Sequence, residues 1–140
     1  MKILTEELSL STRGQDDLHD LTGEIGTRLG RHGFKEGQVT VFAAGSTCAV
    51  VVMENEKGLR KDMAEAYERI APAKAHYAHH DSAGDDNGSS HVRASIQGPS
   101  LTIPFTRGKL VLGQWQQVVL AEFDTRPRDR RVILQFLAAP

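Results

Sequence analysis

The sequence predicts an α+β protein, in which a mainly antiparallel β-sheet is covered on one face by two amphipathic helices. Two segments of the first half repeat apolar residues every three or four positions, as amphipathic helices do. The second half consists mostly of strand-like segments joined by short turns, which favour antiparallel pairing. Helical and strand patterns do not alternate as in a βαβ repeat, which favours the α+β class.

Length and composition limit the classes of protein that fit. The 140 residues suit one domain, residues 1–140, that is large enough for its own core. A net charge of −1 offers no broad basic field for nucleic acid, and no apolar run could cross a bilayer. We therefore expect neither as a partner. The single cysteine, Cys48, cannot form an internal disulfide, which favours a reducing cytoplasm.

The first half of the chain contains three predicted strands and two predicted helices. Residues 2–11 follow an imperfect period of two, and the β-branched run at 48–53 suits a buried strand. Asp16 or Asp17 is the expected cap of the first helix. The predicted elements are a strand over 2–11, a helix from Asp16 to Gly30 or Gly33, strands over 37–43 and 48–53, and a helix over 59–70 that is stopped by Ala71-Pro72.

The second half begins with a long polar segment and continues with strands. Residues 77–91 show neither helical nor strand periodicity, so we expect a loop, and a loop of this length inside a domain is usually functional or disordered. Pro104 suggests an edge strand or a strand end. The predicted elements after the loop are a short helix over 91–96, which ends at Gly98-Pro99, and strands over 100–105, 109–112, 114–123 and 130–137.

The polar segment carries groups that bind metal ions. Four of the six histidines lie in it or beside it: His76, His79, His80 and His91. Imidazole and carboxylate groups suit zinc and other transition metals. His79 and His91 are twelve residues apart across a glycine-containing loop, which could bring them to one ion. The spacing is not a standard zinc signature, so a hydrogen-bonded polar loop with exposed histidines is the alternative.

The same segment has features of a phosphate site. Residues 84–90 precede a predicted helix, whose first backbone N–H groups attract anions. Asn87 adds an amide, and nearby hydroxyls come from Ser46, Thr47, Ser89 and Ser90. Asp85 and Asp86 would repel phosphate unless a cation lies between them. For Ser89 and Ser90 a simple helix cap is the alternative.

Other catalytic motifs are missing from the sequence. It contains no nucleophile elbow, no P-loop and no dinucleotide fingerprint. Cys48 begins an apolar strand, so we expect a buried, inert thiol. A local basic cluster, which is either solvated loop charge or a contact for a phosphorylated ligand, comprises Arg126, Arg128, Arg130 and Arg131.

A series of motifs runs in consistent order from Gly37 to Leu137. They are Ser46-Thr47-Cys48-Ala49, Glu54-Asn55-Glu56, Tyr77-Ala78-His79, Gly84-Asp85-Asp86-Asn87-Gly88, Ser90-His91-Val92-Arg93-Ala94-Ser95, Gly98-Pro99-Ser100-Leu101-Thr102-Ile103-Pro104, Gly108-Lys109-Leu110, Leu112-Gly113-Gln114-Trp115-Gln116-Gln117 and Glu122. In these motifs the sequence resembles the YjbQ-like family, also called the secondary thiamine-phosphate synthase family.

The resemblance implies a compact α+β fold, a homotrimer and a histidine site at the subunit boundaries that can hold a metal ion. It also implies weak thiamine-phosphate synthase activity, in which a pyrimidine-methyl diphosphate is joined to a thiazole phosphate and diphosphate leaves. On this hypothesis His79 and His91 hold a divalent ion, zinc or magnesium, whose shell Asp85 or Glu54 completes. The donors around the departing diphosphate would be Ser46, Thr47 and Ser90, with Asn87 beside them.

The sequence departs from the family pattern at two positions. Family members usually have histidine where Gly45 stands, and many have histidine where Ser89 stands. Loss of a neutral imidazole removes a strong ligand. The alternative hypothesis is therefore a non-catalytic trimer with a degenerate site that binds a metal ion or a small phosphorylated ligand.

Overall fold

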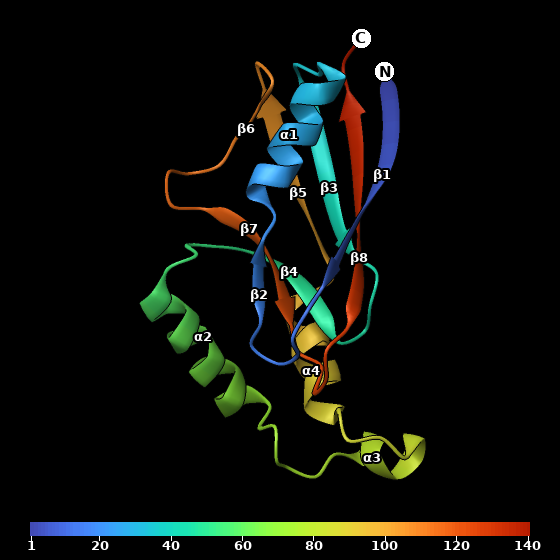
Figure 1. Cartoon of the computed structure of the whole chain (residues 1–140), viewed down its shortest axis with the longest axis vertical. Coiled ribbons are helices and arrows are strands. Elements are labelled where there is room, and N and C mark those ends of the chain that lie inside the picture. Colours follow the sequence, from blue (N-terminus) through green and yellow to red (C-terminus); the bar gives the residue numbers. More distant parts are fainter.

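The computed structural model describes all 140 residues and confirms the α+β class. Figure 1 shows a tall sheet with α1 beside its upper end and with α2, α3 and α4 toward its lower end. In chain order the elements are β1 (Lys2–Ser11), β2 (Leu18–Asp20), α1 (Thr22–His32), β3 (Gly37–Ala43), β4 (Cys48–Met53), α2 (Lys57–Ile70), α3 (Ala78–Ala83), α4 (Gly88–Gln97), β5 (Ser100–Thr106), β6 (Lys109–Leu110), β7 (Gln117–Glu122) and β8 (Asp129–Ala138).

The strands form two sheets, and all their pairs are antiparallel. A five-stranded sheet has the order β1-β8-β3-β5-β6, and a three-stranded sheet has the order β2-β7-β4. Pro104 is tolerated because β6 pairs only with the last two residues of β5, Phe105 and Thr106. The sequence predicts antiparallel pairing correctly, and the structure adds the division into two sheets.

The main core lies between the two sheets and α1. Inward residues of β8 alternate with exposed ones, and Val132, Leu134 and Phe136 are fully buried. Ile25 and Leu29 from α1 are fully buried against the same cluster. This alternation, combined with the helical spacing of α1, is what the sequence patterns predict.

A second apolar cluster packs on the other side of the three-stranded sheet. Its members are Ala49, Tyr67, Ala94, Ala121 and Phe123, which come from β4, α2, α4 and the end of β7. The rings of Tyr67 and Phe123 meet edge to face, with centroids 4.7 Å apart. This cluster fixes α4 against β4, and the first residues of α4 belong to the candidate site described below.

The first helix begins later than the sequence suggests. Residues 18–20 form β2, which pairs with β7 and places Leu18 opposite Ala121. The cap position is Leu21, which makes no side-chain cap hydrogen bond, so neither Asp16 nor Asp17 caps this helix; the carboxylate of the preceding Asp20 accepts a 2.9 Å hydrogen bond from the Thr22 amide. Leu18 fits the helical spacing, but pairing with the neighbouring sheet determines its conformation. The helix ends at Gly33, in the left-handed conformation, which is one of its two predicted ends.

Three further elements differ from the sequence-based expectation. Residues 78–83 of the expected loop form the helix α3, and α4 begins at Gly88 rather than at His91. No residue of α3 is buried, so it leaves no apolar period in the sequence. Residues 114–116 are not part of β7, because the Gln116 side chain folds back to accept a hydrogen bond from the Gly113 amide. None of the helices is long and apolar enough to cross a membrane.

Candidate functional site: a histidine pocket and a buried arginine–carboxylate network

The imidazoles of His79 and His91 lie next to each other. Their ring centroids are 4.5 Å apart, and the rings are inclined by 60°. His79 belongs to α3 and His91 to the second turn of α4, so the connection between the two helices folds one ring back onto the other. Gly84 ends α3 with a φ of 67°, a conformation that glycine adopts without strain. The sequence-based expectation that these two histidines converge is confirmed.

Close packing between α3 and α4 holds this arrangement. The Gly88 amide donates a 3.0 Å hydrogen bond to Nε2 of His80. A Cβ atom at Gly88 would lie 2.5 Å from the Cβ of Tyr77 and 2.9 Å from Nε2 of His80. Only a residue without a side chain fits at this contact, so Gly88 sets how closely the two helices approach.

A pocket of about 250 Å³ opens beside His91. The loop after β3 forms one wall through Gly45 and Ser46, and α4 forms the opposite wall. The complete lining is Gly45, Ser46, Cys48, His91, Ala94, Ser95 and Pro99. The pocket therefore offers an imidazole and two serine hydroxyls to a small polar ligand.

Three other predicted ligand-binding residues are buried beneath the surface. The Thr47 hydroxyl donates to Asp124 at 2.9 Å and accepts a 2.7 Å hydrogen bond from Nη2 of Arg130, so its only donor is already used. The side-chain oxygens of Asn87 and Ser90 are buried at the start of α4 without a hydrogen-bond partner. Ser89 shares this state, and no cap hydrogen bond from Asn87 forms.

The predicted carboxylates lie away from the histidine pair. Asp85 is 3.6 Å from Nη2 of Arg126, and its pKa is lowered mainly by a hydrogen bond from the Asp86 amide. β4 begins at Cys48, which lines the pocket, and Glu54 follows the other end of the strand. With a rise of about 3.3 Å per strand residue, Glu54 therefore lies about 20 Å from Cys48. Within one chain the structure brings His79 to His91, and Ser46 lines the same pocket as His91. Neither Glu54 nor Asp85 joins them in a group that could hold a metal ion.

The residues of one chain supply only part of a metal site. The two adjacent imidazoles are suitable ligands for a transition-metal ion, and two ligands fall short of the three or four protein ligands of a zinc site. No group of three or more histidine, cysteine, aspartate or glutamate side chains in the chain is arranged so that it could hold a metal ion. Water or another subunit would have to supply the remaining ligands.

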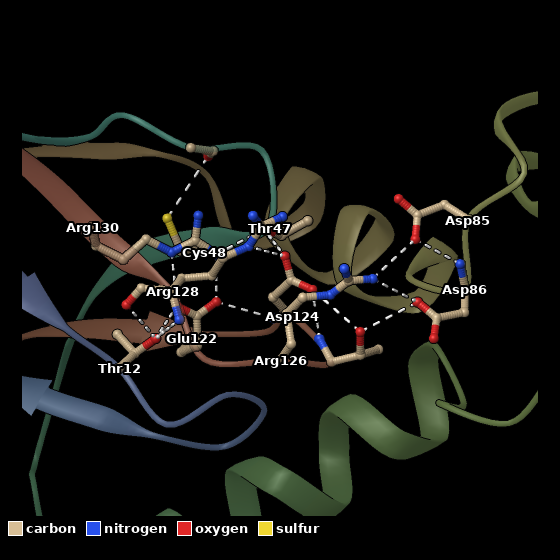
Figure 2. A network of polar contacts seen from close by, with 12 residues as sticks. Thr12, Thr47, Cys48, Asp85, Asp86, Glu122, Asp124, Arg126, Arg128 and Arg130 are labelled. Carbon is tan, nitrogen blue, oxygen red and sulfur yellow. Dashed lines mark hydrogen bonds and ion pairs between the residues drawn. The ribbon is translucent and has the colours of Figure 1, made fainter.

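A buried polar network adjoins the pocket and is drawn in Figure 2. Nε and Nη2 of Arg130 donate to the two oxygens of Glu122, the first at 2.7 Å. Glu122 also accepts a 2.7 Å hydrogen bond from the Thr12 hydroxyl and a 3.0 Å bond from the Asp124 amide. Arg128 pairs with Asp124 at 2.7 Å. The network contains two cations and two carboxylates, so its formal charges balance.

Burial and hydrogen bonding determine the ionisation of groups in this network. Burial works to raise the pKa of Asp124, but hydrogen bonds from Arg128, Thr47 and the Thr125 amide outweigh it and lower the pKa. Burial raises the pKa of the Cys48 thiol, which Arg130 opposes. Cys48 is 1% exposed and neutral at pH 7, as expected from its apolar strand.

Sequence reasoning missed the burial of Arg130, which it treated as one of four loop arginines. A signal was available, because Arg130 occupies the same strand face as Val132, Leu134 and Phe136. Glu122 likewise continues the inward face of Val118 and Leu120. A charged residue in phase with inward apolar residues on each of two strands indicates a buried ion pair.

A family model described as "UPF0047 protein YjbQ-like" matches residues 6–139. This chain belongs to the YjbQ-like family. A UPF0047 protein of Methanothermobacter thermautotrophicus is 36% identical over 140 residues, covering 100% of this chain and 96% of the relative. A UPF0047 protein of Archaeoglobus fulgidus is 35% identical, covering 94% and 99%.

Solved structures of similar proteins share the fold. A protein of Sulfolobus solfataricus, described as YbjQ-like and of unknown function, superposes with a TM-score of 0.91 at 29% identity and covers 99% of both chains. A hypothetical protein of Aeropyrum pernix gives a TM-score of 0.84 at 29% identity and covers 96% of this chain and 99% of its own. The YjbQ-like fold therefore extends over nearly the whole chain.

Proposed function

We propose that this YjbQ-like protein binds a small phosphorylated metabolite in the histidine pocket and couples a pyrimidine-methyl diphosphate to a thiazole phosphate. The observation that carries the proposal is the pairing of His79 with His91, 4.5 Å apart, at a pocket that also presents Ser46 and Ser95. A site with several hydrogen-bond donors and little negative charge suits phosphate oxygens.

In this reaction the thiazole nitrogen forms a bond to the methylene carbon, and the bond from that carbon to the diphosphate oxygen breaks. Negative charge accumulates on the departing diphosphate, so donors aimed at it lower the barrier. His91, Ser46 and Ser95 are the side chains of the pocket that can donate to it. A divalent ion, when bound, would neutralise part of the same charge, and His79 and His91 are the residues that would hold it.

Three further features complete the proposal. The protein forms a homotrimer in the cytoplasm, and the site lies between subunits, so a neighbouring chain can add ligands such as Glu54. Exposed apolar side chains suit such contacts: Phe42 is 42% exposed and Ile3 is 65% exposed, both on the five-stranded sheet. Light scattering of the purified protein tests the assembly, because a trimer has three times the 15.4 kDa mass of the chain.

The rate of the coupling reaction in the wild type and in His91→Ala tests the transferase function. We expect the variant to lose most of the activity, whereas His76→Ala, which removes an exposed histidine paired with Asp81, keeps it. If the wild type and His91→Ala give the same background rate, this site does not catalyse the reaction. Metal analysis of protein purified without a histidine tag shows whether an ion accompanies the site.

A second candidate function is a non-catalytic trimer that binds a phosphorylated ligand or a metal ion. The observation in its favour is the incomplete ligand set, because two imidazoles stand without a third metal-binding side chain of the same chain. A protein that binds the thiazole phosphate but forms no coupled product would establish this function.

A further inference from the structure

A long segment between α2 and α4 buries none of its own side chains. This α3 segment runs over residues 72–86, and each of its residues is exposed or half-buried. The residues on either side of it, Ala71 and Asn87, are buried. Apolar burial therefore contributes little to the position of the α3 segment, and polar contacts must determine where it lies.

The turn after α3 presents two neighbouring carboxylates, Asp85 and Asp86, to one arginine. Nη2 of Arg126 lies 3.6 Å from Oδ1 of each carboxylate. The hydroxyl of Thr125 adds a 3.3 Å hydrogen bond to Asp86. Figure 2 shows Arg126 reaching from the loop after β7 toward both carboxylates. One cation between two adjacent carboxylates offsets their mutual repulsion, and it attaches this turn to the loop.

The loop that carries Arg126 is itself fixed by the buried network. Asp124, two residues earlier, is fully buried and accepts hydrogen bonds from Thr47 and Arg128. The Thr125 amide donates to the same carboxylate at 2.7 Å. Arg126 therefore projects from a well-anchored base toward a segment without a buried side chain. We expect its ion pairs to place the α3 segment rather than the loop.

We propose that Arg126, through the carboxylates of Asp85 and Asp86, positions the imidazole of the α3 segment at the histidine pocket. That imidazole is His79, whose ring centroid lies 4.5 Å from that of His91. The inference rests on the proposed function only in taking this histidine pair as part of the binding site. Arg126 does not line the pocket, so it acts as a positioning residue, through His79.

Two contacts keep the α3 segment beside α4, and they differ in exposure. One is the partly buried hydrogen bond from the Gly88 amide to His80. The other is the exposed clasp, in which the side chains of Arg126 and Asp86 are 58% and 74% exposed. Exposed ion pairs are weak and are screened by salt. Loss of the clasp should therefore loosen the segment by a modest factor and leave the rest of the fold intact.

Nuclear Overhauser effects between the carbon-bound ring protons of His79 and His91 test this inference. We expect Arg126→Gln to lose about half of the wild-type intensity or more. Arg126→Lys, which restores a cation, should recover most of it. The matched control is Arg31→Gln, an exposed position on α1, which should keep the full intensity. A folded Arg126→Gln protein with the wild-type intensity would overturn the inference.

Removal of the carboxylates tests the clasp from its other side. The double variant Asp85→Asn, Asp86→Asn should weaken the ring contact as much as Arg126→Gln does. All three substitutions together should weaken it no further, because the partners act through each other. About 1 M sodium chloride should weaken the contact in the wild type but not in Arg126→Gln. Losses that simply add in the combined variant would overturn the direct pairing.

Titration with inorganic diphosphate separates this inference from the proposed function. We expect Arg126→Gln to bind diphosphate about two- to tenfold more weakly than the wild type. A weaker ring contact with unchanged binding supports the clasp and refutes the need for His79 in the site. A wild type that binds no diphosphate refutes the proposed pocket, and the Overhauser effect then still decides on the clasp. Weaker binding with an unchanged ring contact would overturn the positioning role.

Discussion

Arg130 and Glu122 form a buried, doubly hydrogen-bonded pair that joins β8 to the end of β7. Glu122 is fully buried, and Arg130 is 7% exposed. The two residues belong to different sheets, so the pair connects the five-stranded sheet to the three-stranded one. It also holds the Arg130 guanidinium against Gly45, where an added Cβ atom would lie 2.7 Å from Nη1.

Removing one charge of this pair should be costly. Glu122→Gln leaves the Arg130 cation buried without its counter-ion, and we expect the free energy of unfolding to fall by about 3 kcal/mol. Urea denaturation followed by circular dichroism measures the change. The control is Glu7→Gln, which breaks an exposed ion pair with Arg131 and should have little effect. Equal stability of the two variants would show that the buried pair does not hold the sheets together.

The contact between α3 and α4 should tolerate no side chain at Gly88. The methyl group of Gly88→Ala would overlap Tyr77 and His80, so we expect a loss of about 1–3 kcal/mol in unfolding free energy and weaker ligand binding. Gly26→Ala is the control, because the new methyl group meets nothing within 4 Å and lies inside α1. It should stabilise the protein by about 0.5–1 kcal/mol. A Gly88→Ala protein with wild-type stability would contradict the close packing.

Asp17 should make stability depend on acidic pH. Burial works to raise the pKa of its carboxyl, but hydrogen bonds from the Arg13 side chain and amide and from His19 lower it to about 2. The folded pKa is below the ordinary value of 3.8, so the stabilisation is complete above pH 3.8 and is lost as the pH falls toward 2.

The variant Asp17→Asn measures this contribution. We expect it to be less stable than the wild type by about 2 kcal/mol at pH 7, and the difference should shrink below pH 4. Asp62→Asn, an exposed position on α2, is the control and should show no such trend. A difference that stays constant between pH 7 and pH 3 would indicate lost packing rather than a lost charge interaction.

Regular periodicity made much of the fold predictable, and tertiary contacts explain the rest. β1, β3 and β4 begin and end where their alternating or β-branched patterns do. Leu18 fits a helical stripe, yet it lies in β2 because β7 offers a strand partner, which no local pattern reveals. The helix α3 buries nothing and is stabilised by contacts from Tyr77 and Gly88, so apolar spacing could not predict it.

The candidate site was predictable only where its residues were chemically conspicuous. The loop between His79 and His91 is rich in polar groups and glycine, which suggested a fold-back, and the rings do meet. The partners of Thr47 could not be predicted, because Asp124 and Arg130 are 77 and 83 residues away in the chain. Their approach depends on how the two sheets pack.

The central claim is that the His79–His91 pair belongs to a pocket that binds phosphorylated ligands. Imidazole NMR signals of the wild type, recorded while inorganic diphosphate is added, test it most directly. We predict that the signals of His79 and His91 shift together and saturate at one concentration. Those of His19 and His32, which pair with Asp17 and Glu6 elsewhere, should stay fixed. Unchanged His79 and His91 signals at saturating diphosphate would contradict the account.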